Sequence, residues 1–542
     1  MTVLPKTQFA VQLVGPSQLR LNDAKAVKTP AAHEVLIKIE ACGICFSDLK
    51  LLKQFGAHPR KSGVKAGLTG EVLAEIQGYV PGDMPTVPGH EVVGRVVAVG
   101  NAVKQHRIGE RVLVQADWRD LKTEGSNGAF GYNFEGGLQE YCLLDERVVI
   151  DSKGQRYLLP VGEGKPASAV ALVEPWACVE DSYVTRERNT LKAGGVTVIV
   201  GECEGAVTVK SLGLPVAREG LPREVQVVKP ADVGTMVNES CDDIVYLGAD
   251  KKVLDILSDK LATRGIINVV LGGKKIGTPV SVGVGRVHYG MTRWVGTTGT
   301  DAGAGYKNIP ATGELRAKDS ICIVGAGGPM GQMHVIRDVC AGLAGVEVVA
   351  TDMDDARLES LGKKVIPLAK ANGVKLRLVN TAKEKLTEAF SYHALMAPVG
   401  ALVAAAVMTS RPGAIINIFA GIPAGVKQDI DLDTYIERGV FMFGTSGSEI
   451  EDMRIVLRKV ESGQLNTNAS VDAVAGIAGA VDGIAATENR TLAGKIIVYP
   501  MLHELGLLPL VDMGKRFPTV AAKLADGQWT QEAEQELLRV AK

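Results

Sequence analysis

The sequence has no excess of either charge and no long hydrophobic run, and each shortage excludes a class of protein. Its 60 Lys and Arg residues balance 61 Asp and Glu residues, and its pI is near 6.7. This balance does not point to nucleic acid or to an acidic membrane surface. The longest apolar run, Leu395 to Met408, is too short to span a bilayer, and residues 1–15 lack the segments of a secretory leader. We therefore expect no nucleic-acid partner and no membrane association.

Cysteine is also scarce. The eight cysteines are scattered along the chain, and only Cys42 and Cys45 form a close pair. This spacing is not that of a disulfide framework, and it predicts a reducing, cytoplasmic location.

Glycine, in contrast, is abundant. It accounts for 63 of 542 residues, whereas about 7% is usual. The glycines follow no collagen period, and a hydrophobic content of 46% disfavours disorder. They therefore indicate many tight turns and close backbone approaches, as in nucleotide-binding α/β domains. The length itself predicts three to four domains, at a prior of about 150 residues each.

The chain divides into three regions that differ in their pattern of strand-prone and helix-prone segments. Residues 1–190 contain short β-prone runs separated by glycine and proline, which predict a small barrel-like domain. From residue 191 apolar strands alternate with helix-prone segments, as in the βαβ units of a parallel sheet. The same alternation begins again near residue 318. We therefore expect domains at 1–190, 191–317 and 318–449, and a helical surface extension at 501–542.

The second and third regions are copies of each other. The segment ending at Gly272 matches the one ending at Gly421, 149 positions later, and the segment around Gly296 matches the one around Gly444, 148 positions later. The first copy is shorter, because Gly201 to Gly272 spans 71 positions, against 96 in the second copy. About one β-α segment is therefore missing from its first half.

A dinucleotide-binding turn is predicted in the second copy, where a strand runs into IVGAGGPMG at 323–331. Glycines there allow a tight turn and let backbone N–H groups approach a pyrophosphate at a helix N-terminus. The spacing departs by one residue from the usual G-x-G-x-x-G. Asp352 is placed to bond a ribose 2′-hydroxyl and favours NAD over NADP, while Arg357 moderates this preference. The residues assigned to the cofactor are Gly325, Gly327, Gly328, Pro329, Met330, Gly331, Asp352 and Arg357.

The equivalent turn of the first copy, VGECEGAVTV, differs in composition. It offers Gly201 and Gly205, but Glu202 and Glu204 accompany them. Carboxylates at this position repel a pyrophosphate. We therefore interpret the first copy as a degenerate domain without nucleotide binding.

A metal site is predicted in the first region. The segment ACGICFSD supplies Cys42, Cys45, Ser47 and Asp48, and VPGHEVVG supplies His90 and Glu91. A catalytic zinc takes about three N, S or O protein ligands and keeps one position open. Cys45, His90 and a carboxylate meet this requirement. The alternative interpretation is a buried thiol pair and a structural histidine, which the presence of both segments beside a cofactor turn disfavours.

These residues, with further motifs, resemble the zinc-dependent medium-chain dehydrogenases. The matching segments follow in order along most of the chain: GICFSD, PGHEVVGRVVAVG, GERV, FEGGLQEY, LVEPWACVE, the glycine-rich turn and LAGKIIVYP. The resemblance implies an α/β protein. It would have a GroES-like β-rich catalytic domain, completed by about 450–500, and two tandem Rossmann-like doubly wound domains, the first degenerate. Within the superfamily, the sequence is similar to the polyol and sugar-phosphate branch, including the sorbose-1-phosphate reductases.

The resemblance also implies roles for individual residues. It draws the zinc ligands from Cys45, His90, Glu91 and Glu174. The cysteine and histidine match the first two ligands. Glu91 matches the neighbouring carboxylate, which can ligate the zinc or exchange with substrate. Glu174 matches the third ligand or an acid that holds a water. Ser47 matches the hydroxyl that relays a proton away from the alcohol. Asp48 matches the carboxylate that lies near the catalytic histidine.

The sequence departs from the family pattern in three places. Residues 115–134 contain no cysteine, whereas family members often have a four-cysteine zinc lobe there, so we expect one catalytic zinc and no structural zinc. The loop between Cys45 and His90 holds 44 residues, is longer than usual, and is expected to border the active site or a subunit contact. The doubled nucleotide domain is the third departure.

The resemblance implies reversible oxidation of a secondary alcohol, in a polyol or sugar phosphate, to a ketone, with NAD as hydride carrier. We expect a homo-oligomer, a dimer or a tetramer, with a small-molecule substrate. Two alternatives stay open: a metal-free medium-chain reductase that uses NADPH, and a non-catalytic protein that senses a nucleotide. Candidate hydroxyl-binding residues are Tyr132, Asn133 and Glu135, and candidate phosphate contacts are Arg119 and Lys122.

Overall fold

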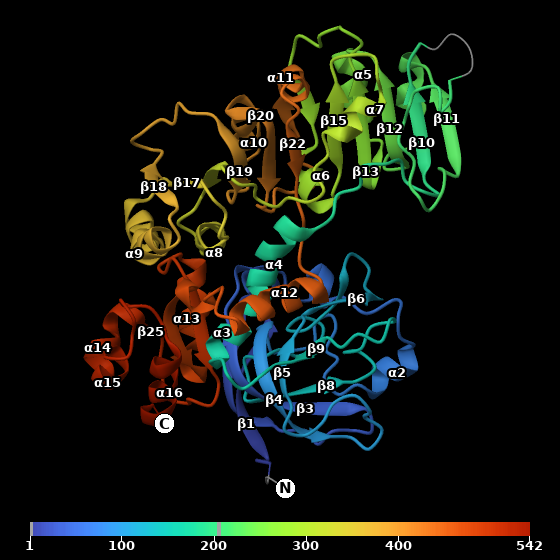
Figure 1. The fold of residues 1–542 in the computed structure, drawn as a ribbon. Helices are drawn as coiled ribbons and strands as arrows, with labels where there is room; N and C mark the ends of the chain where they lie inside the picture. The colour runs from blue at the N-terminus through green and yellow to red at the C-terminus, as the bar shows by residue number, and fades with distance from the viewer. Residues whose placement is uncertain (1–3, 203–206, 542) are drawn as a thin grey trace. The chain divides into compact units, whose positions relative to one another are not determined.

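A computed structural model of the chain describes residues 4–202 and 207–541, which form two compact units (Figure 1). The first unit comprises residues 1–180 and 447–542, and the second comprises residues 181–446. The chain therefore leaves the first unit, builds the whole of the second, and returns. No helix in the described residues is long and apolar enough to cross a membrane.

The first unit is built on a mainly antiparallel sheet in the order β25-β23-β24-β3-β4-β5-β9, with β8 also paired to β3. Its strands are β3 (Glu34–Gly43), β4 (Glu91–Val99), β5 (Arg111–Val114), β8 (Tyr141–Asp145), β9 (Leu158–Pro160), β23 (Val471–Gly476), β24 (Lys495–Tyr499) and β25 (Leu508–Pro509). Two small sheets join β1 (Thr7–Gly15) to β2 (Gln18–Ala26) and β6 (Asp117–Lys122) to β7 (Asn127–Ala129). Strand β24 comes from the end of the chain and lies beside β3 from its beginning.

Short helices surround this sheet. They are α1 (Phe46–Gln54), α2 (Gly70–Glu75), α3 (Ala167–Ala171), α12 (Ile450–Glu461), α13 (Ala480–Glu488), α14 (Met513–Arg516), α15 (Pro518–Ala521) and α16 (Gln531–Val540). Helix α4 (Val173–Val184) runs from the first unit into the second. In the C-terminal segment, Trp529 is fully buried, and the Glu534 carboxylate accepts hydrogen bonds from the backbone N–H groups of Ala167 and Ser168. These bonds anchor α16 to the start of α3.

The second unit contains two parallel sheets. The sheet of the second copy has the order β18-β17-β16-β19-β20-β22, the 3-2-1-4-5-6 order of a doubly wound dinucleotide-binding domain. Its elements are β16 (Ser320–Val324), α8 (Pro329–Val339), β17 (Glu347–Asp352), α9 (Asp355–Ala371), β18 (Lys375–Asn380), β19 (Phe390–Leu395), α10 (Gly400–Met408), β20 (Ser410–Ile418), β21 (Gln428–Ile430), α11 (Leu432–Glu437) and β22 (Phe441–Phe443). Central strands such as β16 are continuous apolar runs, because a parallel sheet is covered on both faces.

The first copy forms a five-stranded sheet in the order β11-β10-β12-β13-β15. Its elements are β10 (Val196–Val200), β11 (Glu224–Val228), β12 (Cys241–Leu247), α5 (Lys251–Leu257), β13 (Leu261–Val270), β14 (Val280–Val282), α6 (Val284–Tyr289), β15 (Arg293–Thr297) and α7 (Gly303–Lys307). In its described residues it has no counterpart of α9 and β18. This confirms the prediction from the repeat spacing that one β-α segment is missing.

The two copies meet through a two-fold pseudo-symmetric interface. Strands β14 and β21 pair antiparallel, and Ser281 pairs with Asp429, the residue 148 positions later. Because 148 positions also separate Gly296 from Gly444, Ser281 pairs with its own counterpart in the other copy. This pattern is what a two-fold axis produces in an isologous interface.

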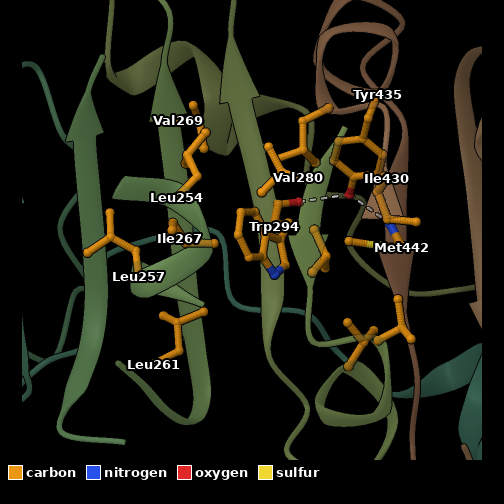
Figure 2. Close-up of a cluster of buried hydrophobic side chains, with 14 of the residues drawn as sticks. Leu254, Leu257, Leu261, Ile267, Val269, Val280, Trp294, Ile430, Tyr435 and Met442 are labelled. Atoms are coloured by element: carbon orange, nitrogen blue, oxygen red, sulfur yellow. Dashed lines mark hydrogen bonds between the residues drawn. The ribbon is translucent and has the colours of Figure 1, made fainter. Parts of the chain in front are cut away.

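A shared hydrophobic core continues this interface, and strand β15 of one sheet contacts β22 of the other (Figure 1). Figure 2 shows Trp294 of β15 packed beside Tyr435 of α11. The Tyr435 hydroxyl donates a hydrogen bond to the Trp294 carbonyl at 2.8 Å and accepts one from the Met442 backbone N–H at 3.0 Å. Buried apolar side chains of both copies thus form one core, with its buried hydroxyl satisfied.

Two glycines at equivalent positions make this close approach feasible. A methyl group on Gly444 would lie 2.7 Å from the carbonyl oxygen of Ile418 and 2.8 Å from Cα of His288. A methyl group on Gly296 would lie 2.7 Å from the Val269 carbonyl and 2.8 Å from the Ile436 side chain. Residues 288 and 436 are themselves 148 positions apart, so each copy places the same position against the other copy's glycine.

We predict that Gly444→Ala destabilises the second unit by about 1–3 kcal/mol, because the atoms that the new methyl group meets are backbone atoms that cannot move aside. Gly425→Ala is the matched control, since nothing lies within 4 Å of its added methyl group. Differential scanning calorimetry of the full chain should show a lowered transition for the first variant only. Equal transitions for the two variants would contradict this tight packing.

The long segment between β3 and β4 folds around a buried lysine. Lys61 ends a short 3-10 helix (Pro59–Lys61), and its ammonium donates hydrogen bonds to the carbonyls of Val80 and Met84. Burial lowers the pKa of Lys61 to about 7, although the negative charges of Asp83 and Glu135 oppose this shift. Lys61 therefore links the 3-10 helix to Val80 and Met84, which lie 19 and 23 positions later in the chain.

The lowered pKa makes the stability of the first unit depend on pH. Between pH 7 and about 10 the unfolded chain binds the Lys61 proton and the folded chain does not, so the free energy of unfolding rises with pH. This contribution is lost as the pH falls towards 7. In Lys61→Met we expect this dependence to flatten, by at most about 1.4 kcal/mol per pH unit. Tryptophan-detected urea unfolding at pH 7, 8 and 9 tests this, and parallel pH profiles for both chains would disprove it.

Candidate functional site

The turn after β3 presents Cys45 and Asp48. Cys45 occupies the N-cap position of α1 in an extended conformation, and its backbone N–H donates to the Asp48 carboxylate at 3.0 Å. An acidic residue in the first turn of a helix also interacts favourably with the helix dipole. This arrangement fixes the position of the Cys45 thiol, while the neighbouring Cys42 side chain is buried in the core.

His90 directly precedes β4, and Asp48 orients its ring. The second oxygen of the Asp48 carboxylate lies 3.0 Å from His90 Nδ1. Burial lowers the pKa of His90, but the negative charge of Asp48 and its hydrogen bond outweigh burial and raise the pKa overall. A carboxylate on one ring nitrogen leaves the other, Nε2, to bind a metal.

Glu91, the first residue of β4, brings a carboxylate to the same point. The thiol of Cys45, a ring nitrogen of His90 and a carboxylate oxygen of Glu91 lie within 4.8 Å of one another. Glu91 is fully buried, and its Oε2 has no hydrogen-bond partner in the described part of the chain. An unsatisfied buried carboxylate oxygen beside a thiol and an imidazole fits the donor set of zinc.

Lys495 compensates the charge of Glu91. It lies in the matching segment LAGKIIVYP, but no role was predicted for it. It is the first residue of β24, and its buried ammonium donates to Glu91 Oε1 and to the Ile44 carbonyl, the latter at 2.8 Å. Burial lowers its pKa, but the charges of Glu91 and Cys45 raise it overall. A further signal in the sequence is that this lysine begins an otherwise apolar strand.

Glu174 lies on α4 and is also nearly buried. Burial raises the pKa of its carboxyl group to about 7; the positive charge of His90 opposes this shift, and the negative charge of Glu91 adds to it. Its carboxylate does not belong to the three-atom group of Cys45, His90 and Glu91. Its role as a ligand or water-holding acid therefore stays a prediction.

Ser47 and Tyr132 border the three donor atoms. The Ser47 hydroxyl lies 3.1 Å from the Cys45 sulfur and 3.2 Å from His90 Nε2. The ring centroids of Tyr132 and His90 are 5.7 Å apart. The hydroxyl of Ser47 is thus the polar group next to the position where a metal would bind.

The other candidate substrate residues have structural partners. The Asn133 side chain accepts a hydrogen bond from Ala129 N and donates one to the Ser62 carbonyl, and Glu135 forms an ion pair with Lys25 at 2.9 Å. Arg119 pairs with Asp117 and Glu449, and Lys122 donates to the Asn127 side chain. Of the five candidates, only Tyr132 contacts a member of the predicted metal site.

In the second unit, the glycine-rich turn joins β16 to α8. Gly325 has a φ of +80°, which glycine adopts without strain. A methyl group on Gly331 would lie 2.3 Å from the Gly325 carbonyl oxygen, so this glycine lets α8 begin close to β16. Gly328 caps α8, and Pro329 and Met330 form its first turn. This turn follows β16, next to β19, where the strand order of the sheet reverses and dinucleotides bind.

Asp352 ends β17 and faces this turn. Its carboxylate accepts a hydrogen bond from Gly327 N at 2.9 Å and another from Met353 N at 2.8 Å. A methyl group on Gly327 would lie 2.6 Å from Cβ of Arg357, so Arg357 also borders the turn. The acidic residue, the arginine and the glycines are thus brought together, although 27 positions separate Gly325 from Asp352. In the first copy, Glu204 and Gly205 lie outside the described residues.

Comparison with known proteins identifies the β-rich region. Residues 31–154 match the alcohol dehydrogenase GroES-like domain. The chain is 25% identical over 342 residues to L-sorbose 1-phosphate reductase of Klebsiella pneumoniae, covering 54% of this chain and 76% of that protein. It is 30% identical over 139 residues to alcohol dehydrogenase notN of an Aspergillus species, covering 23% of this chain but only 33% of that protein.

A solved structure shows the same fold. The 2R,3R-butanediol dehydrogenase of Bacillus subtilis superimposes with a TM-score of 0.53 at 15% identity, covering 91% of this chain and all of that one. The comparison supports the predicted combination of a GroES-like region with Rossmann-like parallel sheets. The added first copy gives this chain two such sheets.

We predict that Lys495→Met lowers the free energy of unfolding of the metal-free chain by about 3–5 kcal/mol, because it leaves the buried Glu91 carboxylate unpaired. Lys53→Met is the matched control. It breaks an exposed ion pair to Glu488 and should cost less than about 1 kcal/mol. Urea unfolding in the presence of a chelator measures both. The double variant Glu91→Gln/Lys495→Met should recover most of the loss, and a loss that persists would show that packing of the lysine stem matters more than its charge.

Proposed function

We propose that this chain is an oxidoreductase of the medium-chain dehydrogenase/reductase superfamily and that it interconverts a secondary alcohol and a ketone. In this proposal, NAD is the hydride carrier and one zinc ion is bound in the first unit. The observation that carries the proposal is that Cys45, His90 and Glu91 lie together beside the Ser47 hydroxyl, in a chain that also contains a sheet with the strand order of dinucleotide-binding domains.

Cys45, His90 and Glu91 would hold the zinc ion, and Glu174 stands nearby as an alternative carboxylate. When bound, zinc supplies Lewis-acid polarisation of a hydroxyl group, and the dinucleotide supplies the hydride acceptor. Asp48 holds the His90 ring through Nδ1 and so keeps Nε2 directed at the site. The Lys495 ammonium pairs with the Glu91 carboxylate and holds it in place.

Two groups of this chain would transfer protons during the reaction. The Ser47 hydroxyl, between the sulfur of Cys45 and the ring of His90, is placed to take the proton of a reacting alcohol and pass it outward. Glu174, with a pKa near 7 owing to its burial, can exchange a proton at neutral pH. Both groups can therefore work in either direction of the reaction.

In the second unit, the turn from Gly325 to Gly331 would bind the pyrophosphate at the N-terminus of α8. Asp352 would bond the ribose 2′-hydroxyl after exchanging its hydrogen bond to Gly327. Its negative charge favours NAD over NADP. The substrate class that we propose, a polyol or sugar phosphate, follows the names of relatives such as L-sorbose 1-phosphate reductase.

The test is Cys45→Ala, with zinc analysis and NAD reduction measured against a panel of polyols, polyol phosphates and simple alcohols. We expect the parent chain to bind one zinc at this site, and the variant to lose it together with about 10²- to 10⁴-fold in turnover, since Lewis-acid stabilisation contributes several kcal/mol. Cys340→Ala, which removes a thiol from the second unit, should leave both properties unchanged.

The outcomes separate the alternatives. Full turnover of zinc-free Cys45→Ala with NADPH and an activated carbonyl or alkene would favour a metal-free reductase. Tight NAD binding without turnover of any alcohol would favour a nucleotide sensor. Either result would overturn the proposed zinc-dependent reaction.

A further inference from the structure

Arg60 lies beside the predicted metal site, in the long segment between β3 and β4. It is the middle residue of the short 3-10 helix Pro59–Lys61. Its backbone N–H donates to the His58 ring at 3.2 Å, which fixes the start of this helix. The side chain is 31% exposed.

The guanidinium of Arg60 has few protein partners. Among the described residues it makes one ion pair, to Asp117 at 3.7 Å, and no hydrogen bond. Asp117 already has closer partners, because its carboxylate accepts hydrogen bonds from Asn127 at 3.1 Å and from Arg119 at 3.3 Å. An arginine presents five N–H donors, and those of Arg60 are therefore available to a ligand.

Tyr132 connects Arg60 to the predicted metal site. The guanidinium carbon lies 5.6 Å from the centre of the Tyr132 ring, a distance typical of a cation–π contact. The same ring is 5.7 Å from the His90 ring and 5.1 Å from the His58 ring. The guanidinium carbon is therefore no more than about 11 Å from the centre of the His90 ring, a span within the length of a phosphorylated polyol.

Charges of both signs lie near Arg60. Burial lowers the pKa of Arg60, but nearby negative charges, including those of Asp117 and Glu174, raise it overall. The pKa of the adjacent His58 is lowered to about 4, by burial first and then by the positive charges of Arg60 and Lys50. His58 is therefore neutral at physiological pH, and the positive potential comes from the arginine and the lysine. The guanidinium of Arg119, in contrast, donates hydrogen bonds to Asp117, Glu449 and the Ser448 carbonyl.

We propose that Arg60 binds an anionic group of the substrate, a phosphate monoester or a carboxylate, while the substrate's hydroxyl reacts at the site of Cys45, His90 and Glu91. This rests on the proposed function. The planar guanidinium can form two parallel hydrogen bonds to such a group, with Tyr132 supporting one face of the guanidinium. Arg60 would then determine specificity for anionic over neutral alcohols.

The experiment compares one polyol with its terminal phosphate ester, as substrates of the zinc-loaded parent chain and of Arg60→Gln. We expect kcat/KM for the phosphate ester to fall about 10- to 100-fold in the variant, and kcat/KM for the neutral polyol to change less than about 3-fold. Arg60→Lys, which keeps the charge but not the paired donors, should lose less. Arg95→Gln is the matched control, because it removes a guanidinium of similar exposure that pairs with Glu40 and Glu163, and it should leave the ratio of the two substrates unchanged.

Two results would overturn the proposal while the proposed function stands. One is equal kcat/KM for the two substrates in the parent chain, unaffected by Arg60→Gln. The other is a rise in the KM for the dinucleotide in place of the substrate, which would assign Arg60 to cofactor binding.

If no alcohol is turned over, the proposed function fails, and Arg60 is judged by binding. The phosphate ester should then raise the unfolding temperature of the zinc-loaded parent chain more than that of Arg60→Gln. An equal rise in both chains, or none in the parent chain, would overturn the proposal.

Discussion

The buried ion pair between Glu91 and Lys495 is the constraint on which the first unit depends. It joins the first residue of β4 to the first residue of β24, which lie 404 positions apart. Both strands flank β3, whose end leads to Cys45. A charged carboxylate can be kept in the core only if a counter-charge reaches it. The predicted metal site therefore requires the chain to return from the second unit and complete the sheet.

The second unit is organised by an interface that a single copy could not form. An isolated parallel sheet ending in β22 would expose an apolar edge, and here β15 of the first copy packs against it. Equivalent positions meet across the interface, as they would between two identical subunits. The shortened first copy thus provides the surface against which the glycine-bearing copy packs.

Most of the candidate site residues come from short local segments of the sequence. Cys45, Ser47 and Asp48 share one turn, and His90 and Glu91 are neighbours, so two short segments already contained most of the polar groups. No role was predicted for Lys495, although it lies in the matching segment LAGKIIVYP, or for Arg60, which lies in a segment without a motif. Asn133, Glu135, Arg119 and Lys122 were plausible by type, yet the structure gives each of them a partner in the fold.

The sequence by itself determined the succession of strands and helices, the duplication, the shortened first copy and the residue types that suit a zinc site and a dinucleotide-binding turn. These features are encoded locally, in apolar periodicity, glycine positions and short motifs. Only the tertiary structure decided which donor atoms lie within 4.8 Å of one another, which carboxylate is neutralised by a lysine, and which arginine keeps free donors. Those properties depend on burial and on contacts between residues far apart in the chain, and no local pattern specifies them.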